Sequence, residues 1–204
     1  MTFLTEAGKS AIQAAVDGIE ARSSAEVVVL VRPRSGSYLH ADLLAGIGVG
    51  LFTLWFQLFS PWEFSLPSIL ALPVLTGVAL AMVVSRAPAV RRGLTSAVHR
   101  DENVRIAARA AFVDHGVDRT RGRTGILVYV SLLERRAEVV PDRGLDVAVA
   151  AAGWTESVAA IDRAARDLKA EDLAAALRRL GDRLAAALPR AEDDLDELAA
   201  EVVA

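Results

Sequence analysis

The sequence predicts a layered α/β domain, in which helices cover a small mixed sheet, with a two-helix membrane hairpin inserted into it. Segments of helical periodicity alternate with short Val-, Ile- and Leu-rich runs, typical of buried strands, on both sides of residues 43–85. Within that stretch, two uncharged runs, 43–62 and 64–85, are separated by the single carboxylate of Glu63. Each run has about 20 residues, the helical length that crosses the hydrocarbon core of a bilayer.

The composition limits the classes of function. A chain of 204 residues has room for one soluble domain and the hairpin. Its net charge of −3 does not favour nucleic acid as a partner. The absence of cysteine excludes disulfides, thiol catalysis and thiolate metal sites. The first twenty residues carry acids and a lysine where a signal peptide needs an apolar core, so we expect no cleavable export signal.

Before the hairpin, the sequence predicts one helix and one strand. Thr5 can cap a helix that ends near Arg22. The expected apolar face of this helix consists of Ile12, Val16 and Ile19. Residues 25–32 form an unbroken apolar run that suits a central strand covered on both faces.

After the hairpin, the pattern of helices and strands resumes. In order, we expect a basic juxtamembrane segment (87–98), a helix (101–115), a strand (124–131), an antiparallel strand (136–141), an irregular loop (142–153) and two helices (154–169 and 171–188). The predicted α/β domain is thus assembled from residues 1–40 and 87–190. The hairpin occupies residues 41–86, and an acidic tail occupies 191–204.

The charges flanking the hairpin predict its orientation. The connection between the runs has no Lys or Arg, whereas Arg32 and Arg34 precede the hairpin and four arginines follow it within 86–100. Positively charged loops stay cytoplasmic, so we expect a two-pass protein of the cell (inner) membrane with both termini in the cytoplasm. Trp55 and Trp62 belong to an aromatic cluster near the outer end, as an interfacial belt requires.

Small residues in the two runs predict close helix packing. Gly46 and Gly50 form a GxxxG pattern, and Gly77 with Ala81 forms a second small pair. These residues suit packing within the hairpin or, alternatively, a homodimer through it. Pro73 is expected to kink the second span. Neither run contains an ionisable group, which argues against an ion pathway.

Two blocks of sequence resemble the TPM-domain family, in its YgcG-like branch of bacterial membrane proteins. The first block is FLTEAGKSAI…IEARSSAEVVVLV (residues 3–31), and the second is RTGILVYVSLLERRAEVVPDRGL (residues 123–145). Trp154 at the start of a following helix also fits. The resemblance implies a Rossmann-like three-layer fold with an inserted hairpin. It also implies that phosphatase activity or calcium binding, attributed to some members, is worth testing.

The chain departs from the members regarded as phosphatases at two places. They carry paired aspartates just before the first helix, where this chain has Met1, Thr2 and Phe3. They also have an Asn before the strand glycine, where this chain has Thr124.

The candidate site lies where the two parallel-type strands end. Ligands of open α/β sheets bind beyond the carboxyl edge of the strands, which here would gather Arg32, Arg34, Ser131 and Glu134, with Asp142 nearby. Glu134 and Asp142 are the candidate ligands of Ca²⁺ or Mg²⁺, because hard cations prefer carboxylate oxygens. A metal-bound water could then attack a phosphate ester. In the alternative interpretation, both acids only shape a turn and a loop.

Other catalytic motifs are missing from the sequence. The three histidines, His40, His99 and His115, lack the spacing of a zinc site, and there is no P-loop, GxGxxG or GxSxG. We therefore expect a membrane-anchored TPM-domain protein whose cytosolic face binds a protein partner or supports a complex. The alternative is a divalent-metal-dependent phosphatase tethered to the membrane.

Overall fold

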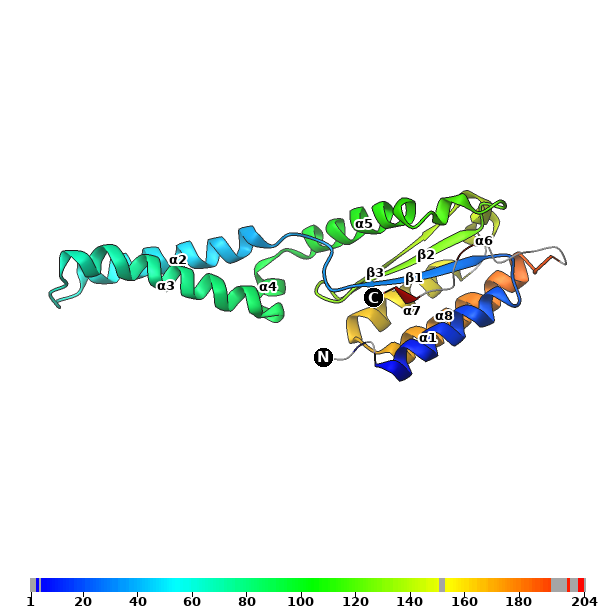
Figure 1. The fold of residues 1–204 in the computed structure, drawn as a ribbon, viewed down its shortest axis with the longest axis horizontal. Helices are drawn as coiled ribbons and strands as arrows, with labels where there is room; N and C mark the ends of the chain where they lie inside the picture. The colour runs from blue at the N-terminus through cyan, green and yellow to red at the C-terminus, as the bar shows by residue number, and fades with distance from the viewer. Residues whose placement is uncertain (1–2, 4, 151–152, 192–197, 199–201, 204) are drawn as a thin grey trace. The chain divides into compact units, whose positions relative to one another are not determined.

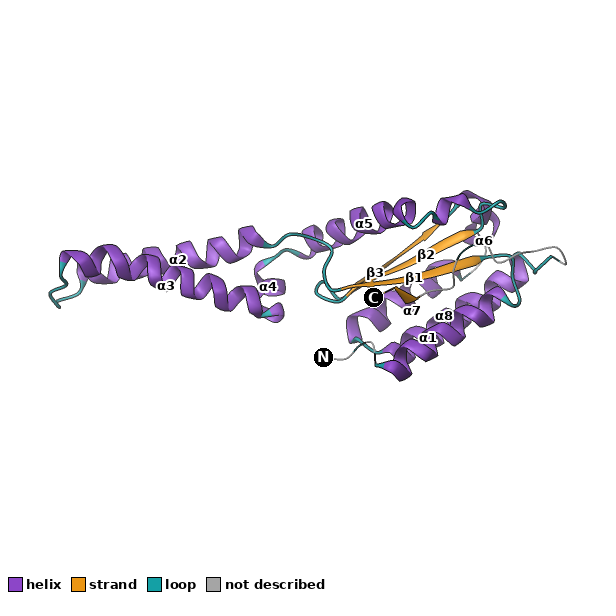
Figure 2. Ribbon diagram, in the orientation of Figure 1, coloured by secondary structure: helices purple, strands orange, loops and turns teal. Residues whose placement is uncertain are grey.

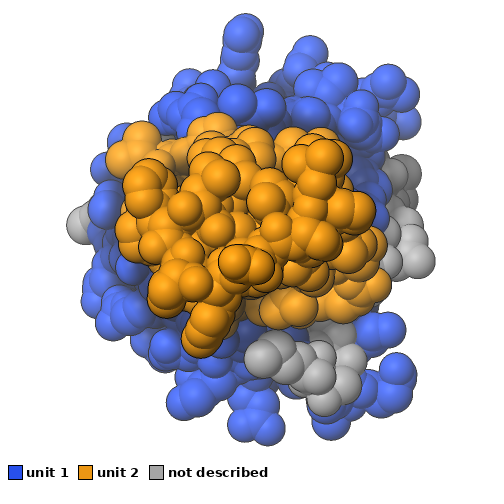
Figure 3. All heavy atoms as spheres, turned by 90° about the vertical axis from the view of Figure 1, so that its left-hand side faces the viewer, with its two compact units in different colours: residues 1–35, 101–204 blue, residues 36–100 orange. Residues whose placement is uncertain are grey.

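The computed structural model describes the chain except for residues 1–2, 4, 151–152, 192–197, 199–201 and 204 (Figure 1). The chain forms two compact units (Figure 3). The first unit combines residues 1–35 with 101–204, and the second consists of residues 36–100. The second unit therefore also contains juxtamembrane residues that we had assigned to the α/β domain.

A four-stranded sheet with the order β3-β2-β1-β4 forms the centre of the first unit (Figure 2). Strands β1 (Glu26–Arg32) and β2 (Gly125–Ser131) are parallel, with Glu26 opposite Gly125 and Arg32 opposite Ser131. Strand β3 (Arg136–Pro141) is antiparallel to β2, as predicted. The two-residue strand β4 (Val202–Val203) is parallel to β1.

Helices cover both faces of this sheet, which confirms the predicted mixed α/β class. Helices α1 (Glu6–Glu20), α7 (Trp154–Asp167) and α8 (Ala170–Ala187) share one core with alternate strand residues such as Val29 and Val128. On the other face, α5 (Ala97–Asp114) packs on Leu30, Leu127 and their neighbours (Figure 1). Burial on both faces explains why β1 and β2 have no alternating polar residues.

Local sequence signals account for several element boundaries. Thr5 caps α1 by accepting a hydrogen bond from the Gly8 N–H at 2.9 Å. Gly116 follows α5 in the left-handed region with φ 65° and leads into the 3₁₀ turn η1 (Val117–Arg119). A side chain at Gly125 would lie 2.1 Å from the Val117 carbonyl oxygen, so only glycine allows β2 to start against this turn.

Three predicted segments differ from the structure. The segment 142–153, which we expected to be irregular, contains the 3₁₀ turn η2 (Arg143–Leu145) and the short helix α6 (Asp146–Ala150). The juxtamembrane segment contains the helix α4 (Pro88–Leu94), and α5 begins four residues earlier than expected, at Ala97. Part of the expected acidic tail forms β4, while most of the rest lies outside the described residues.

The second unit is built on two apolar helices. Helices α2 (Leu39–Phe59) and α3 (Leu66–Arg86) have 21 residues each and are long and apolar enough to cross a membrane. Helix α2 begins before the first uncharged run and includes Asp42, and α3 extends to Arg86 just after the second run. Pro73 lies inside α3, and the helix continues past it from Leu66 to Arg86.

Candidate functional site

The carboxyl edge of β1 and β2 brings together most of the predicted site residues. Arg32 and Ser131 end the two strands side by side. Arg32 is half-buried and Arg34, two residues further along, is exposed. Glu134 lies in the turn between β2 and β3, and therefore at the same edge.

Glu134 is buried at this edge and holds two segments together. The residue is only 3% exposed. One carboxylate oxygen accepts the Ser35 N–H at 3.0 Å, and the other accepts the Ser131 hydroxyl. Ser35 Oγ also lies 2.7 Å from Ser131 Oγ and 3.2 Å from the Tyr129 hydroxyl. The carboxylate thus ties the turn after β2 to the segment after β1.

Asp142 lies at the opposite end of the sheet. Its N–H donates to the carbonyl of Gly125, the first residue of β2, at 2.9 Å. Its Oδ1 accepts the Arg143 N–H at 2.7 Å, which caps η2. Oδ2 is buried and has no hydrogen bond to the part of the chain that the structure describes, and the Arg123 guanidinium is 3.9 Å away.

The positions of these two acids rule out a metal ion bound by both. The whole of β3 separates them, and six residues of strand span about 20 Å. Among the described residues, no three His, Asp or Glu side chains lie together as a metal site. Glu134 and Asp142 therefore cannot ligate one ion, contrary to the expected pair. Binding of Ca²⁺ or Mg²⁺ by either one alone stays a prediction.

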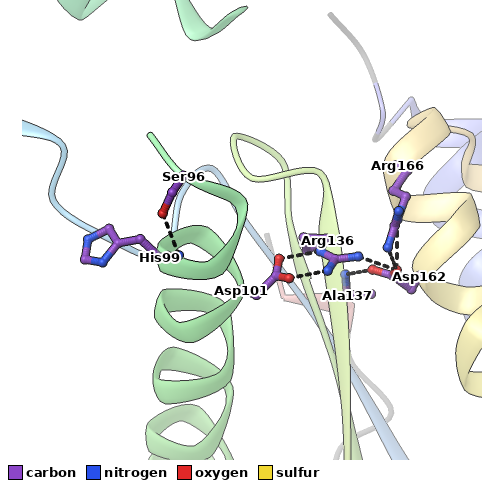
Figure 4. Close-up of polar contacts among 7 residues, drawn as sticks. All are labelled: Ser96, His99, Asp101, Arg136, Ala137, Asp162 and Arg166. Atoms are coloured by element: carbon purple, nitrogen blue, oxygen red, sulfur yellow. Dashed lines mark hydrogen bonds and ion pairs between the residues drawn. The ribbon is translucent and has the colours of Figure 1, made fainter. Parts of the chain in front are cut away.

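A charged cluster around Arg136, which we did not predict, lies at the same edge as Glu134 (Figure 4). The Arg136 guanidinium pairs with Asp101 of α5 and donates to Asp162 of α7 at 2.8 Å. Asp162 also accepts the Ala137 N–H at 3.1 Å and pairs with Arg166. The hydrogen bond from Arg136 to Asp101 is the largest cause that raises the pKa of Arg136, and the interaction with Asp162 raises it further. The cluster ties helices on both faces of the sheet to the edge strand.

Beside this cluster, Glu138 occupies a partly desolvated position. A cavity of about 280 Å³ is lined by Glu138, Arg136 and residues of α5 and α7. Burial raises the pKa of the Glu138 carboxyl, although nearby Arg105 and Arg109 favour its ionised form. The ionised carboxylate is therefore less stable here than in water.

Within the second unit, the predicted small residues form the contact between α2 and α3. A methyl group on Gly46 would lie 2.7 Å from the Gly77 carbonyl oxygen, and one on Gly77 would lie 2.8 Å from that of Gly46. A methyl group on Gly50 would lie 2.9 Å from the Pro73 carbonyl oxygen. Gly46 and Gly50 thus pack against α3 within the hairpin, which is one of the two roles expected for the GxxxG pattern.

Polar side chains also connect the two helices, which hydropathy alone did not indicate. The hydroxyl oxygens of Thr53 and Thr76 are 3.0 Å apart. Gln57 is 5% exposed and its amide donates to the Ser68 carbonyl at 3.1 Å. Nearer the connection, aromatic rings gather as expected. Their contacts are Trp55 with Phe52 and Phe59, and Phe56 with Trp62 and Phe64.

An ion pair fastens α4 to the other end of the hairpin. Arg91 of α4 donates to both carboxylate oxygens of Asp42, in the first turn of α2, with one contact at 2.9 Å. Both side chains are largely buried, at 14% and 6% exposure. The hydrogen bond to Asp42 raises the pKa of Arg91.

Comparisons with known proteins give a likeness in fold. No protein-family model and no curated protein matches the chain. The NMR structure of the BA42 protein from the psychrophilic bacterium Bizionia argentinensis is similar, with a TM-score of 0.59. The likeness covers 98% of this chain and 94% of that chain, at 18% sequence identity. At this identity the similarity concerns the fold alone.

Proposed function

We propose that this chain is a two-pass protein of the inner membrane whose α/β unit serves as a binding module in the cytoplasm. The observation that carries the proposal is the exposure of the apolar side chains of α2 and α3. In the most apolar windows of these helices, only 17% and 11% of the residues are buried. The core helix of a soluble protein would bury most of its apolar residues, whereas lipid covers those of a membrane helix.

The charges around the hairpin support the proposed orientation. Near the end that holds the start of α2 and the end of α3, four arginines (Arg86, Arg91, Arg92 and Arg100) outnumber the single acid Asp42. The connection at the other end carries only Glu63. This bias follows the positive-inside rule with both termini in the cytoplasm.

The binding role is supported by the carboxyl edge of β1 and β2. Arg34 is exposed there beside the half-buried Arg32, while the buried Glu134 fixes the backbone around them. The proposed family remains the TPM-domain family with its Rossmann-like fold, on the strength of the sequence blocks quoted above. The alternative of a metal-dependent phosphatase gains no support, because its two proposed ligands lie at opposite ends of β3.

Two experiments test the proposal. Carbonate extraction of cell membranes should leave the full chain in the membrane pellet, and its release into the supernatant would contradict membrane insertion. For the binding role, a photo-crosslinking amino acid at Arg34 should give a crosslinked protein in cells. The same amino acid at Asp17, exposed on α1, is the control. Identical patterns from both positions would contradict a binding edge at β1 and β2.

A further inference from the structure

A cavity lined mainly by polar residues opens at the base of the hairpin, within the second unit. Its volume is about 390 Å³. The lining residues are His40, Leu94, Thr95, Ser96 and His99. They come from the start of α2, the end of α4, the two residues that join α4 to α5, and the start of α5. None of these residues belongs to the β-strand edge described above.

The groups around this cavity suit an anion. The imidazole rings of His40 and His99 meet edge to face, with centroids 5.5 Å apart, and can supply N–H donors. Ser96 Oγ accepts the His99 N–H at 3.2 Å at the start of the 18-residue helix α5 (Figure 4). The first turn of a helix leaves N–H groups without helical partners, and its dipole favours negative charge.

Thr95 provides an independent observation that points to a ligand. The residue is 5% exposed, and its buried hydroxyl oxygen has no hydrogen-bond partner among the described residues. Leaving such a group unsatisfied is costly, so buried hydroxyls nearly always have a partner. Thr95 lines the cavity, so a group bound there can be the partner that its hydroxyl lacks.

We propose that this cavity binds the phosphate group of an anionic phospholipid. The inference rests on the proposed membrane insertion, because it needs the cavity at the depth of the headgroups. Helices of 21 residues span about 31 Å, close to the thickness of the hydrocarbon core, so the first turn of α2 lies at the membrane surface. Leu94, 53% exposed at the cavity, offers an apolar contact that a lipid can use and free phosphate cannot.

The charge of this region also favours an anionic lipid. Four arginines (Arg86, Arg91, Arg92 and Arg100) against the one acid Asp42 give the base of the hairpin a net positive charge. Basic residues at the cytoplasmic surface attract anionic headgroups over zwitterionic ones. The site should therefore discriminate phosphatidylglycerol from phosphatidylcholine.

The three histidines of the chain make a direct test available. The full chain, labelled with ¹⁵N at histidine and solubilised in dodecyl maltoside, is titrated with phosphatidylglycerol and observed by NMR. The signals of His40 and His99 should shift saturably, while that of His115, outside the cavity, serves as the internal control. Equal shifts of all three signals, or no shift, would overturn the proposal. Phosphatidylcholine should give no shift, and an equal response to it would also overturn the proposal.

Two further arms define the ligand and the role of Thr95. Sodium phosphate without lipid should shift the signals much less, and an equal response would assign free phosphate and overturn the lipid. Thr95→Val should raise the lipid concentration at half-saturation about fivefold, the effect of one lost hydrogen bond. The exposed Thr155→Val is the matched control. An unchanged titration of Thr95→Val, with the His115 signal intact, would contradict the assigned role. Carbonate extraction of the same variant reports insertion separately.

Discussion

Replacing Gly46 with alanine should force the two hairpin helices apart. The new methyl carbon would lie 2.7 Å from the Gly77 carbonyl oxygen and 3.1 Å from the Ala81 methyl carbon. Ordinary contact begins near 3.4 Å. The helices must therefore separate by roughly half an ångström, and such a gap already loses a quarter or more of each contact energy. Overpacking of this kind costs about 1–3 kcal/mol.

Gly48→Ala provides a matched control in the same helix. A methyl group there meets no atom within 4 Å. Both substitutions gain the same helix propensity, up to about 1 kcal/mol, so their difference measures the packing at Gly46 alone. Gly48→Ala should therefore keep or raise the stability of the hairpin.

A disulfide crosslink between the helices can measure this difference. The chain has no native cysteine, and the hydroxyls of Thr53 and Thr76 are 3.0 Å apart, so Thr53→Cys with Thr76→Cys should oxidise readily in membranes. Adding Gly46→Ala should slow crosslinking at least about fivefold, as expected for 1 kcal/mol or more. Equal rates with Gly46→Ala and Gly48→Ala would refute the packing argument. A crosslink between two chains would favour the homodimer alternative.

Three further predictions concern charged groups. Asp162→Ala loses charged hydrogen bonds and should lower the free energy of unfolding by about 2 kcal/mol, measured by urea denaturation followed by circular dichroism. The control Asp167→Ala, at an exposed position, should change this free energy little. The raised pKa of Glu138 means that the contribution of this side chain to stability falls as pH rises above its ordinary value of 4.5. Glu138→Gln should therefore gain stability relative to the wild type between about pH 4 and about pH 7 in the same assay, and a loss over this range would contradict the sign. Asp42→Asn should leave the largely buried Arg91 without its counter-charge and lower the free energy of unfolding by about 3 kcal/mol. Amide hydrogen exchange over residues 88–94 should become faster.

Much of the fold could be predicted because it depends on local patterns. The buried strands follow from unbroken apolar runs, and the hairpin follows from the length of the uncharged segments. Thr5 was recognised as a helix cap because its role involves only residues three positions apart. The short helix α6 was missed because a segment as brief as Asp146–Ala150 contains too few residues to show helical periodicity.

The candidate site was harder to predict because it depends on contacts between distant segments. Glu134 and Asp142 are close in sequence, yet the antiparallel strand between them carries them to opposite ends of the sheet. The partners of Arg136 come from α5 and α7, 35 and 26 residues away, and no spacing rule connects them. Gln57 was overlooked because one polar residue does not alter the hydropathy of a 21-residue helix.

Cysteine labelling can determine on which side of the membrane the α/β unit lies. Single cysteines are placed at Glu63, in the connection between α2 and α3, and at Asp17, exposed on α1. A membrane-impermeant maleimide applied to intact spheroplasts should label the cysteine at position 63 at once. The cysteine at position 17 should react only after the membrane is permeabilised. Labelling of position 17 in intact spheroplasts, or protection of position 63, would contradict a two-pass anchor with its α/β unit in the cytoplasm.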